Sequence, residues 1–363
     1  MRIVAVIMAG GLGVRLWPKS TERRPKQFMH VMGDGTLIQN TVARLGSIMP
    51  MDDIFVVTTA DLRHLVAEQL PEIPDANVIV EPFGRNTAPC IGLSMVHLSA
   101  RLPGDTVAIV MPSDHTIYNV REFHLTLERA CQAAMAYDGL VTIGVTPTRP
   151  ETGYGYIQVG DAADYSGSHP DGLVRTVRTF AEKPDAATAQ RFLDAGDFVW
   201  NSGIFVGRVE MFQRKIDTYL PDHAPLFHVL AKHVGKDSYD DTCTDFYRQM
   251  RSISFDIGVM EKAKNIVVVD GAFGWSDVGS WDEIYRMRLK DGRNNVVEGN
   301  VVTLNTTNAL VIGSTSKMIS LVDVDNLIVV ETESSIMICK RGEAEHVRDV
   351  VDLLRRRNIA RNL

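Results

Sequence analysis

The amino-terminal segment constrains the fold of this chain more than any other stretch. Residues 3–8, Ile-Val-Ala-Val-Ile-Met, are apolar without alternation, which is typical of a strand buried on both faces of a parallel sheet. The run leads into Ala9-Gly10-Gly11-Leu12-Gly13, where glycine permits positive φ angles and lets bare N–H groups approach a ligand. Successive backbone N–H groups in such a turn bind phosphate oxygens. The sequence therefore predicts a strand that ends in an anion-binding loop at Gly10.

Basic residues after the glycines strengthen this prediction. Arg15 and Lys26 would add the positive charge that backbone amides lack. The dinucleotide fingerprint is excluded because Leu16 stands where its third glycine is needed, and the Walker loop is excluded because Pro18 removes a backbone donor before Lys19-Ser20. We interpret the segment as a different loop that cradles a triphosphate. The alternative is a glycine-rich turn between strand and helix that binds no ligand.

The composition narrows the class of protein. A chain of 363 residues with 45% hydrophobic and 23% charged residues is ordinary for a soluble protein with one large and one small domain. The net charge of −7, with scattered basic residues, argues against a nucleic-acid partner. Cys90, Cys131, Cys243 and Cys339 are far apart and form no C-x-x-C, which predicts reduced thiols in the cytoplasm. No stretch is long enough for a membrane span, and we interpret residues 3–9 as a buried strand, not a signal peptide.

Apolar runs alternate with segments of helical periodicity in the first half of the chain. The runs at 54–57, 78–80, 107–111 and 140–145 predict buried strands, and helices are predicted over 36–49, 62–70 and 122–137, with Thr36 as an N-cap. This alternation predicts an α/β fold with a doubly wound sheet. Ligands of such sheets bind at the carboxyl ends of the strands, so the residues directly after each strand are candidates for a site.

Polar residues follow two of these predicted strands. Glu81 follows one of these strands and can accept hydrogen bonds from the N–H groups of a ligand, with Arg85 and Asn86 lining the site; the alternative is a Pro/Gly turn with a capping Asn or Thr. Asp114 follows the next strand, where a carboxylate can hold Mg²⁺ and share it with phosphate. The alternative for Asp114 is a helix cap, and we interpret His115 as a structural histidine.

Four features stand out between residues 150 and 290. The stretch 160–172 is rich in Gly, Ser and Asp, which predicts a surface loop. Lys183, between Glu182 and Pro184, could bind a ligand. The alternative is a surface charge in a turn. Asn201-Ser202-Gly203 interrupts an apolar strand and indicates a bulge or a close backbone approach. Ser276-Asp277 supplies a second isolated carboxylate, with a cap of the following helix as the alternative.

After residue 294 the pattern changes to short β-rich runs. Those at 301–302, 310–312, 319–321, 327–330 and 336–338 are separated by turn residues and predict a small all-β module. A final helix over 343–358 would place four apolar residues on one face: Val347, Val350, Val351 and Leu354. We expect a large domain over 1–293 and a small domain over 294–363. Because residues 296–363 carry none of the phosphate or metal motifs, we expect them to serve assembly and support.

Together these segments resemble one family. G-G-x-G-x-R-L-W-P-x-S at 10–20, followed by P-K-Q-F at 25–28, is similar to the signature of the sugar-nucleotide pyrophosphorylases, and in particular of the mannose-1-phosphate guanylyltransferases. Relatives that act on glucose 1-phosphate usually carry T-R-L-x-P-x-T instead. Further similar segments, in family order along essentially the whole chain, are E-P-x-G-R-N-T-A-P at 81–89, P-x-D-H at 112–115, G-Y-G-Y-I at 153–157, F-x-E-K-P at 180–184, W-N-S-G at 200–203 and W-S-D-V-G-S-W at 275–281.

The resemblance implies a fold and an activity. The implied fold is a Rossmann-like, glycosyltransferase-A-like nucleotidyltransferase domain with a doubly wound mixed sheet, followed by a small left-handed β-helix domain, in a chain that often forms a homodimer. The implied reaction transfers GMP from GTP to α-D-mannose 1-phosphate and yields GDP-mannose and pyrophosphate, with Mg²⁺ as cofactor. Neither nucleic acid nor a membrane is an expected partner. Longer relatives continue into a phosphomannose isomerase domain, and we expect that second activity to be absent.

The resemblance also assigns roles to individual residues. The implied catalytic residues are Arg15, Lys26, Asp114, Lys183 and Asp277. The implied GTP-binding residues are Ala9, Gly10, Gly11, Gly13, Arg15, Lys26, Glu81, Arg85, Asn86, Thr87, Pro112 and Asp114. Among the GTP-binding residues, Glu81, Arg85 and Asn86 would frame the guanine. The residues implied to bind mannose 1-phosphate are Gly155, Glu182, Lys183 and Asn201, and those implied to bind the metal are Asp114 and Asp277. The segment 254–262, S-F-D-I-G-V-M-E-K, departs from the family's more usual S-I-D-Y-A-V-M-E-K at three positions, which leaves its contacts open.

Two other functions stay open as alternatives. The chain could be a nucleotidyltransferase for another hexose 1-phosphate or nucleotide, or a nucleotide-sugar-binding regulatory subunit without turnover. The presence of Lys26, Asp114, Lys183 and Asp277 argues against the second. In the expected reaction the nucleophile is a phosphate oxygen, which is largely ionised at neutral pH because its second pKa is about 6. No general base is then required, in keeping with a sequence that shows no convincing catalytic triad.

Overall fold

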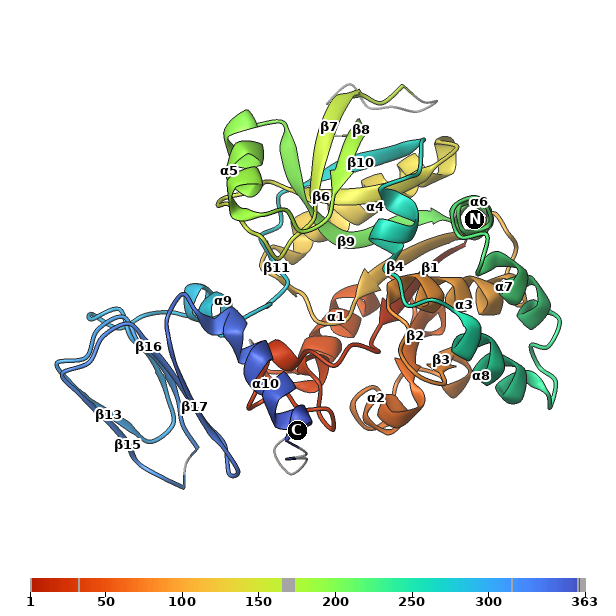
Figure 1. Cartoon of the computed structure of the whole chain (residues 1–363). Coiled ribbons are helices and arrows are strands. Elements are labelled where there is room, and N and C mark those ends of the chain that lie inside the picture. The colour runs from red at the N-terminus through yellow and green to blue at the C-terminus, as the bar shows by residue number, and fades with distance from the viewer. Residues whose placement is uncertain (1, 32, 165–173, 315, 358, 360–363) are drawn as a thin grey trace. The chain divides into compact units, whose positions relative to one another are not determined.

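The computed structural model describes residues 2–31, 33–164, 174–314, 316–357 and 359 (Figure 1). Its contacts divide the chain into two compact units, each assembled from segments far apart in sequence. Unit 1 contains Met1–Gly10, Thr41–Ser113 and Ile117–Trp275, and unit 2 contains Gly11–Asn40, Asp114–Thr116 and Ser276–Leu363. The linear boundary between residues 293 and 294 stays a prediction.

Unit 1 is built on a sheet of mixed strand direction. Its strands, as far as the chain is described, run in the order β3-β2-β1-β4-β9-β6-β10-β8-β7. Their bounds are β1 Ile3–Met8, β2 Ile54–Thr59, β3 Val78–Glu81, β4 Val107–Pro112, β6 Leu140–Val145, β7 Tyr156–Ala162, β8 Val174–Ala181, β9 Phe198–Arg208 and β10 Ile266–Gly271. Strands β1 to β4 are parallel, whereas β9 is antiparallel to β4 and β6. The predicted α/β mixed sheet is confirmed.

Strand β1 lies where the order of the sheet reverses. The chain moves outward from β1 to β2 and β3, and then returns to place β4 on the other side of β1. Met8 pairs with Pro112, and the Ser113 N–H donates to the Met8 carbonyl at 3.1 Å, so both strands end at one edge. Ligands of α/β sheets bind at such a reversal point. The glycine-rich segment begins two residues after β1, and Asp114 follows β4 just as closely.

Helices connect and cover the strands (Figure 1). Their bounds are α1 Leu37–Gly46, α2 Arg63–Gln69, α3 Thr87–Ser99, α4 Val120–Ala136, α5 Ala186–Ala195, α6 Val209–Tyr219, α7 Ala224–Ala231 and α8 Tyr239–Gln249. The predicted cap of α1 is confirmed, because the Gln39 N–H donates to Thr36 Oγ1 at 3.4 Å and the Thr36 N–H donates to Gln39 Oε1 at 3.0 Å. In the described part of the chain, no helix combines the length and apolar character needed to cross a membrane.

Helices α5 to α8 were not predicted from the sequence. Helix α8 shows why, since its sequence YDDTCTDFYRQ is largely polar and only Cys243 and Tyr247 are buried. Such a helix has too narrow an apolar stripe for periodicity to reveal it. Tyr247 packs in the same core cluster as Phe212 of α6 and Phe227 of α7. Tertiary contacts therefore stabilise these helices.

Two further expectations are resolved in unit 1. The predicted loop at 160–172 is wrong at its start, because β7 continues to Ala162 and pairs there with Arg175 of β8. Residues 165–173 of that stretch lie outside the described residues. The predicted irregularity at Asn201-Ser202-Gly203 is confirmed, since the register between β6 and β9 shifts between Thr142 and Gly144. Gly203 takes a φ of 69° at this point.

Unit 2 contains the predicted β-rich module. Its strands are β12 Val296–Glu298, β13 Val301–Leu304, β14 Leu310–Ile312, β15 Ile319–Val322, β16 Leu327–Glu331 and β17 Ile336–Lys340. Parallel pairs join β12 to β14, β14 to β16 and β13 to β15, and the antiparallel strand β17 ends the sheet beside β16. Asparagines at 294, 305, 308 and 326 adopt positive φ between these strands, which asparagine tolerates better than most residues. The two-residue strands β5 Thr116–Ile117 and β11 Trp275–Ser276 form a separate sheet.

The larger of two hydrophobic core clusters in the described part of unit 2 joins segments far apart in sequence. It joins Leu16 and Trp17, just after the glycines, to Trp281 of helix α9 (Trp281–Met287) and to apolar residues of β12, β14, β16 and β17. Trp281 Nε1 donates to the Trp17 carbonyl at 2.9 Å. Helix α10 (Val347–Arg356) packs on the same core. The predicted apolar face of that helix is wrong for one residue, because Val347 and Val351 are buried whereas Val350 is 40% exposed.

Candidate active site

The glycine-rich loop of unit 2 presents its amides and not its carbonyls. Gln27 Nε2 donates to the Gly11 carbonyl at 2.8 Å, and Ser20 Oγ donates to the Gly13 carbonyl at 2.8 Å. In the described part of the chain, the N–H groups of Gly11, Leu12 and Gly13 have no protein acceptor. Gly13 has a φ of 54°, and a Cβ there would lie 2.5 Å from Lys26 Cβ. The loop is therefore shaped to donate to an anion.

Lys26 joins three segments of the chain in unit 2. The Lys26 side chain is 9% exposed, and its Nζ lies 2.7 Å from Asp114 Oδ2. The same Nζ donates to the Asp277 backbone carbonyl at 2.5 Å. Burial alone would raise the pKa of Asp114, but the charges of Lys26 and His115 and the hydrogen bond from Lys26 together lower it. The structure thus brings together Lys26, Asp114 and Asp277, three residues that the sequence predicted for one site.

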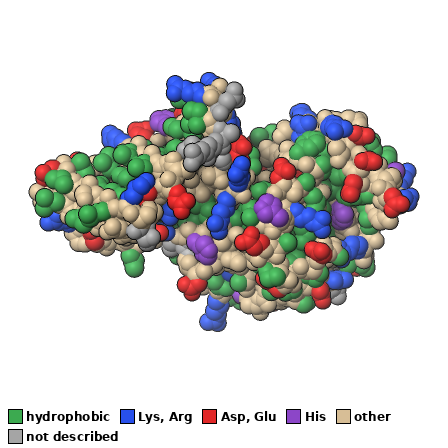
Figure 2. Space-filling model, turned by 90° about the horizontal axis from the view of Figure 1, so that it is seen from below, with side chains coloured by type: hydrophobic (Ala, Val, Ile, Leu, Met, Phe, Trp, Pro, Cys, Tyr) green, Lys and Arg blue, Asp and Glu red, His purple; other side chains and the backbone are tan. Residues whose placement is uncertain are grey.

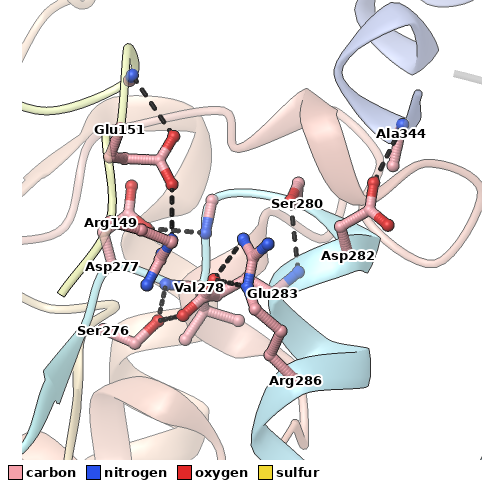
Figure 3. A network of polar contacts seen from close by, with 12 residues as sticks. Arg149, Glu151, Ser276, Asp277, Val278, Ser280, Asp282, Glu283, Arg286 and Ala344 are labelled. Atoms are coloured by element: carbon pink, nitrogen blue, oxygen red, sulfur yellow. Dashed lines mark hydrogen bonds and ion pairs between the residues drawn. The ribbon is translucent and has the colours of Figure 1, made fainter. Parts of the chain in front are cut away.

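The alternative that these aspartates cap helices is wrong. The N-cap of α4 is Asn119, whose side chain accepts from the Glu122 N–H, and the N-cap of α9 is Ser280. Asp277 Oδ1 instead accepts from the Gly279 N–H at 2.8 Å. Its neighbours form a polar network in which Ser276 Oγ bonds Glu283 Oε1, Glu283 bonds Arg286 and the Val278 N–H donates to Ser276 Oγ (Figure 3). That network stabilises the turn from which the Asp277 side chain projects.

The oxygen atoms around Lys26 also suit a divalent cation. Mg²⁺ prefers hard oxygen ligands and usually takes one or two carboxylates together with substrate phosphates. Asp114 supplies one carboxylate beside Lys26, whereas Asp277 contacts Lys26 through its backbone carbonyl and its own carboxylate accepts from the Gly279 N–H. Among the described residues there is no group of three or more His, Cys, Asp or Glu side chains that could hold a metal. The donor set therefore fits Mg²⁺ that is bound jointly with a phosphate ligand.

The residues predicted for guanine lie around the N-terminus of α3 in unit 1. Glu81 is 2% exposed and accepts from the Tyr247 hydroxyl at 3.1 Å, and burial raises its pKa to about 7. Arg85 Nε donates to the Tyr247 carbonyl at 3.0 Å, and its guanidinium lies over the Phe83 ring. Asn86 caps α3, as the alternative interpretation held, because its side chain accepts from the Thr87 N–H at 2.8 Å. The role of these residues toward guanine stays a prediction.

The four residues predicted for mannose 1-phosphate meet in a second cluster of unit 1. The Asn201 N–H donates to the Gly155 carbonyl at 2.8 Å, and a Cβ on Gly155 would lie 2.6 Å from Glu182 Oε2. Lys183 Nζ lies 2.5 Å from Glu182 Oε1. Lys183 is half exposed and takes a φ of 47°, which is uncommon for a residue other than glycine. Its backbone is held by a bond from its N–H to the Tyr154 carbonyl.

Two acidic residues absent from the sequence prediction complete this cluster. Asn201 Nδ2 donates to Asp256 Oδ1 at 2.8 Å, and the Glu182 N–H donates to Glu261 Oε1 at 3.1 Å. Burial, and then the charge of Glu182, raise the pKa of Asp256 to about 6. Asp256 begins a π-helical turn, Asp256–Met260, a form that is frequent at functional sites. The signal was present at 254–262, where the family resemblance keeps both carboxylates.

Comparisons with known proteins agree with this geometry. Residues 4–294 match the Nucleotidyl transferase family, and residues 299–354 match the MannoseP isomerase/GMP-like beta-helix domain. A mannose-1-phosphate guanylyltransferase of Escherichia coli is 34% identical over 97% of this chain and 75% of that protein. The alginate biosynthesis protein AlgA of Pseudomonas aeruginosa is 36% identical over 96% of this chain and 71% of that protein.

A solved structure extends the likeness to the fold. The structure from Thermus thermophilus, described as a mannose-1-phosphate geranyltransferase, is 30% identical and superposes with a TM-score of 0.85 over 98% of this chain and 100% of that one. The match spans both the mixed sheet and the β-helix strands. The chain therefore belongs to the nucleotidyl transferase family and, within it, to the mannose-1-phosphate guanylyltransferases.

Proposed function

We propose that this chain transfers GMP from GTP to α-D-mannose 1-phosphate, which gives GDP-mannose and pyrophosphate. The observation that carries the proposal is the meeting of Lys26, Asp114 and Asp277 beside a loop whose amides face away from protein acceptors. These residues come from segments up to 251 positions apart, so only the fold unites them. The Escherichia coli relative described above is named a mannose-1-phosphate guanylyltransferase, which supports the choice of substrates.

The reaction requires the protein to align the two substrates and to stabilise the negative charge of the phosphates. A phosphate monoester oxygen of mannose 1-phosphate attacks the α-phosphorus of GTP, and pyrophosphate leaves on the opposite side. We propose that the loop amides, Arg15 and Lys26 bind the triphosphate and stabilise the charge that grows on the leaving group. Lys183 binds the phosphate of the incoming sugar phosphate and holds it for attack.

Asp114 and Asp277 are proposed to hold Mg²⁺. Nucleotidyltransferases generally use a divalent metal ion, which when bound neutralises phosphate charge as a Lewis acid. The ammonium of Lys26 already lies against Asp114, so the protein itself compensates part of the carboxylate charge. We further propose that Glu81 accepts hydrogen bonds from guanine, with Arg85, Asn86 and Thr87 beside it. Glu182 and Asn201 would bind the hydroxyls of the hexose, with Gly155 leaving room for them.

Two structural features support the proposals on cellular compartment and oligomeric state. Cys90, Cys131 and Cys243 are buried free thiols, which supports the proposal of a reducing cytoplasm. Strands β13 and β15 expose apolar side chains in register, with Leu304 opposite Val322, at 55% and 52% exposure. A second copy of the chain would cover them, and we propose that the protein forms a homodimer.

Pyrophosphate release across a panel of nucleoside triphosphates and sugar phosphates tests the function. We expect GTP with mannose 1-phosphate to give the highest kcat/KM. A preference for another pair would favour the nucleotidyltransferase alternative, and binding of GDP-mannose without any turnover would favour the regulatory subunit. Replacing Asp277 with Asn in the same assay provides a matched control, because the amide keeps the side-chain shape and removes the charge.

A further inference from the structure

A cavity of about 390 Å³ lies beside the glycine-rich loop within unit 2. Its lining comes from three parts of the chain: Leu12, Gly13, Val14, Arg15 and Lys26 of the loop segment, Asp277 and Gly279, and Arg348, Asp352 and Arg355 of helix α10. The loop and Asp277 belong to the proposed triphosphate site. The three residues of α10 belong to the segment that the sequence assigned to assembly and support only.

Helix α10 faces the cavity because of how its apolar side packs. Arg348, Asp352 and Arg355 are spaced by four and three residues, so they lie along one face of the helix. The adjacent face carries Val347 and Val351, which are buried in the core that also contains Leu16 and Trp17. Burying that apolar stripe therefore turns the polar stripe toward the loop. Figure 1 shows α10, in dark blue, beside the red amino-terminal segment.

The charge of the cavity is unlike that of the outer surface. On the face shown in Figure 2, Lys and Arg side chains are interspersed with Asp and Glu. The cavity instead gathers four cationic side chains, Arg15, Lys26, Arg348 and Arg355, against two aspartates. The lining alone has an excess of two positive charges. Asp114 and Glu22, just outside it, pair with Lys26 and Arg355, so Arg15 and Arg348 are the cations of the lining that have no ion pair among the described residues. A pocket of this kind favours a ligand with several negative charges.

The two arginines of α10 that line the cavity differ in how they are held. Arg355 is positioned by carboxylates, with Nη1 3.1 Å from Asp352 Oδ1 and Nη2 3.0 Å from Glu22 Oε1. Arg348 is exposed and, within the described ranges, has neither an ion pair nor a hydrogen bond. Arg15 is half-buried and, among the described residues, likewise has neither an ion pair nor a hydrogen bond. The cavity therefore has two guanidinium groups whose donors have no protein acceptor there, and guanidinium matches phosphate oxygens in a two-pronged geometry.

We propose that Arg348, with Arg355 behind it, binds the polyphosphate of GTP and the pyrophosphate product, so that helix α10 is part of the substrate site. The proposal rests on the proposed function for the identity of the nucleotide. It does not require turnover, because the group that Arg348 recognises is free pyrophosphate or the two outer phosphates of GTP. GDP-mannose lacks the two outer phosphates of GTP, so its affinity should depend far less on Arg348.

The test measures binding of inorganic pyrophosphate, GTP and GDP-mannose to the full chain by calorimetry with Mg²⁺ present. Arg348→Ala should weaken pyrophosphate and GTP about tenfold and leave GDP-mannose within about twofold. Arg348→Lys should recover part of the loss. Arg356→Ala is the matched control, since Arg356 is an exposed arginine of the same helix outside the cavity lining, and it should bind all three ligands normally.

Each outcome decides the proposal. Unchanged pyrophosphate affinity in Arg348→Ala, equal losses for GDP-mannose, or no binding of pyrophosphate by the unaltered chain would overturn it. Thermal melting of each variant separates lost binding from lost folding, and Arg355→Ala is interpreted only if its melting temperature is retained. If the unaltered chain binds pyrophosphate through Arg348 but never forms GDP-mannose, the proposed function fails while this inference stands. If the chain forms GDP-mannose at a normal rate and Arg348→Ala leaves the pyrophosphate affinity unchanged, the proposed function stands and this inference fails.

Discussion

The sugar-phosphate cluster of unit 1 and the phosphate loop of unit 2 are held in place in different ways. Gly155 precedes β7 and Asn201 lies in β9, where Tyr156 faces Trp200 and the register shift against β6 begins, so pairing at the ends of these strands positions them. Residues 11–16 have no strand of their own. Side chains that bond their carbonyls, and a core that contains Leu16, position them instead.

The clusters also differ in charge. Glu182, Asp256 and Glu261 surround a single half-exposed lysine in unit 1, whereas cations exceed carboxylates around the loop in unit 2. Carboxylates accept hydrogen bonds from hydroxyls, and cations bind phosphate. With the proposed roles, recognition of the sugar phosphate would rest on residues at strand ends of the sheet, and recognition of the triphosphate on contacts between distant segments. The four predictions below test this contrast.

The largest effect is expected from the carboxylates of unit 2. Asp114→Asn or Asp277→Asn removes a charge from the proposed Mg²⁺ site with little change in shape, so kcat/KM should fall by about two decades or more, about 2.7 kcal/mol. Steady-state kinetics at limiting Mg²⁺ measure this, and excess Mg²⁺ should restore part of the loss. Near-normal turnover by a variant with a native circular dichroism spectrum would contradict the metal assignment.

Lys26→Ala should have the next largest effect, confined to one substrate. A charge-assisted contact to phosphate contributes roughly 1.5–3 kcal/mol, so GTP affinity should fall about thirtyfold at matched salt and Mg²⁺. Affinity for mannose 1-phosphate should hardly change if the two clusters act separately. Titration calorimetry checks both ligands, and an unchanged GTP affinity would remove Lys26 from the phosphate cradle.

Lys183→Ala should affect mannose 1-phosphate more than GTP, and by a smaller factor than Lys26→Ala affects GTP. Because the Lys183 side chain is 53% exposed, water screens its charge, and we expect the KM for mannose 1-phosphate to rise about tenfold. The KM for GTP should rise much less. Initial rates with each substrate varied in turn make the measurement. Equal changes in both KM values would mean that Lys183 does not distinguish the two clusters.

The smallest effect concerns how stability depends on pH. The folded pKa of Asp256 is raised from 3.8 to about 6, so the folded chain keeps a proton that the unfolded chain releases, and stability falls as the pH rises across that window. Asp256→Asn removes this dependence and should gain about 1–2 kcal/mol on the unaltered chain between pH 4 and pH 7. Melting temperatures measured across this range report the change.

Asp114 supplies the control of opposite sign. Its pKa is lowered in the folded chain, so its ionised form adds stability that is present above the unfolded pKa and is lost as the pH falls. The melting temperature of Asp114→Asn should therefore drop further below that of the unaltered chain as the pH rises. The same trend in both variants would show that the two clusters do not differ in the electrostatic way proposed.

Sequence patterns predicted the strands better than the helices. Ile3–Met8 and Leu140–Val145 are uninterrupted apolar runs, and the structure has them with the same bounds. Helix α8 buries only two of its eleven residues, too few to produce a period. Tertiary packing, which no local pattern records, decides such segments.

The residues of the candidate site also differ in whether a local sequence pattern predicts them. Lys26, Asp114 and Asp277 were predicted because each stands in a motif, and the fold brings them together. Arg348 stands in no motif. Its place depends on the packing of Val347 and Val351 against Leu16, a contact between residues more than three hundred positions apart in sequence. Periodicity predicted the apolar face of that helix but could not say which surface it would cover.

The discontinuous make-up of unit 2 has a consequence for synthesis on the ribosome. Leu16 and Trp17 are made long before their core partners Trp281 and Val351, which follow more than 260 positions later in the sequence. At about 5–20 residues per second, translation from Lys26 to Asp277, 251 positions apart, takes roughly 12–50 seconds. Throughout that interval the nascent segment around Leu16 and Trp17 carries apolar side chains without these core partners. A chaperone that binds exposed apolar segments would then matter most before Trp281 has been made.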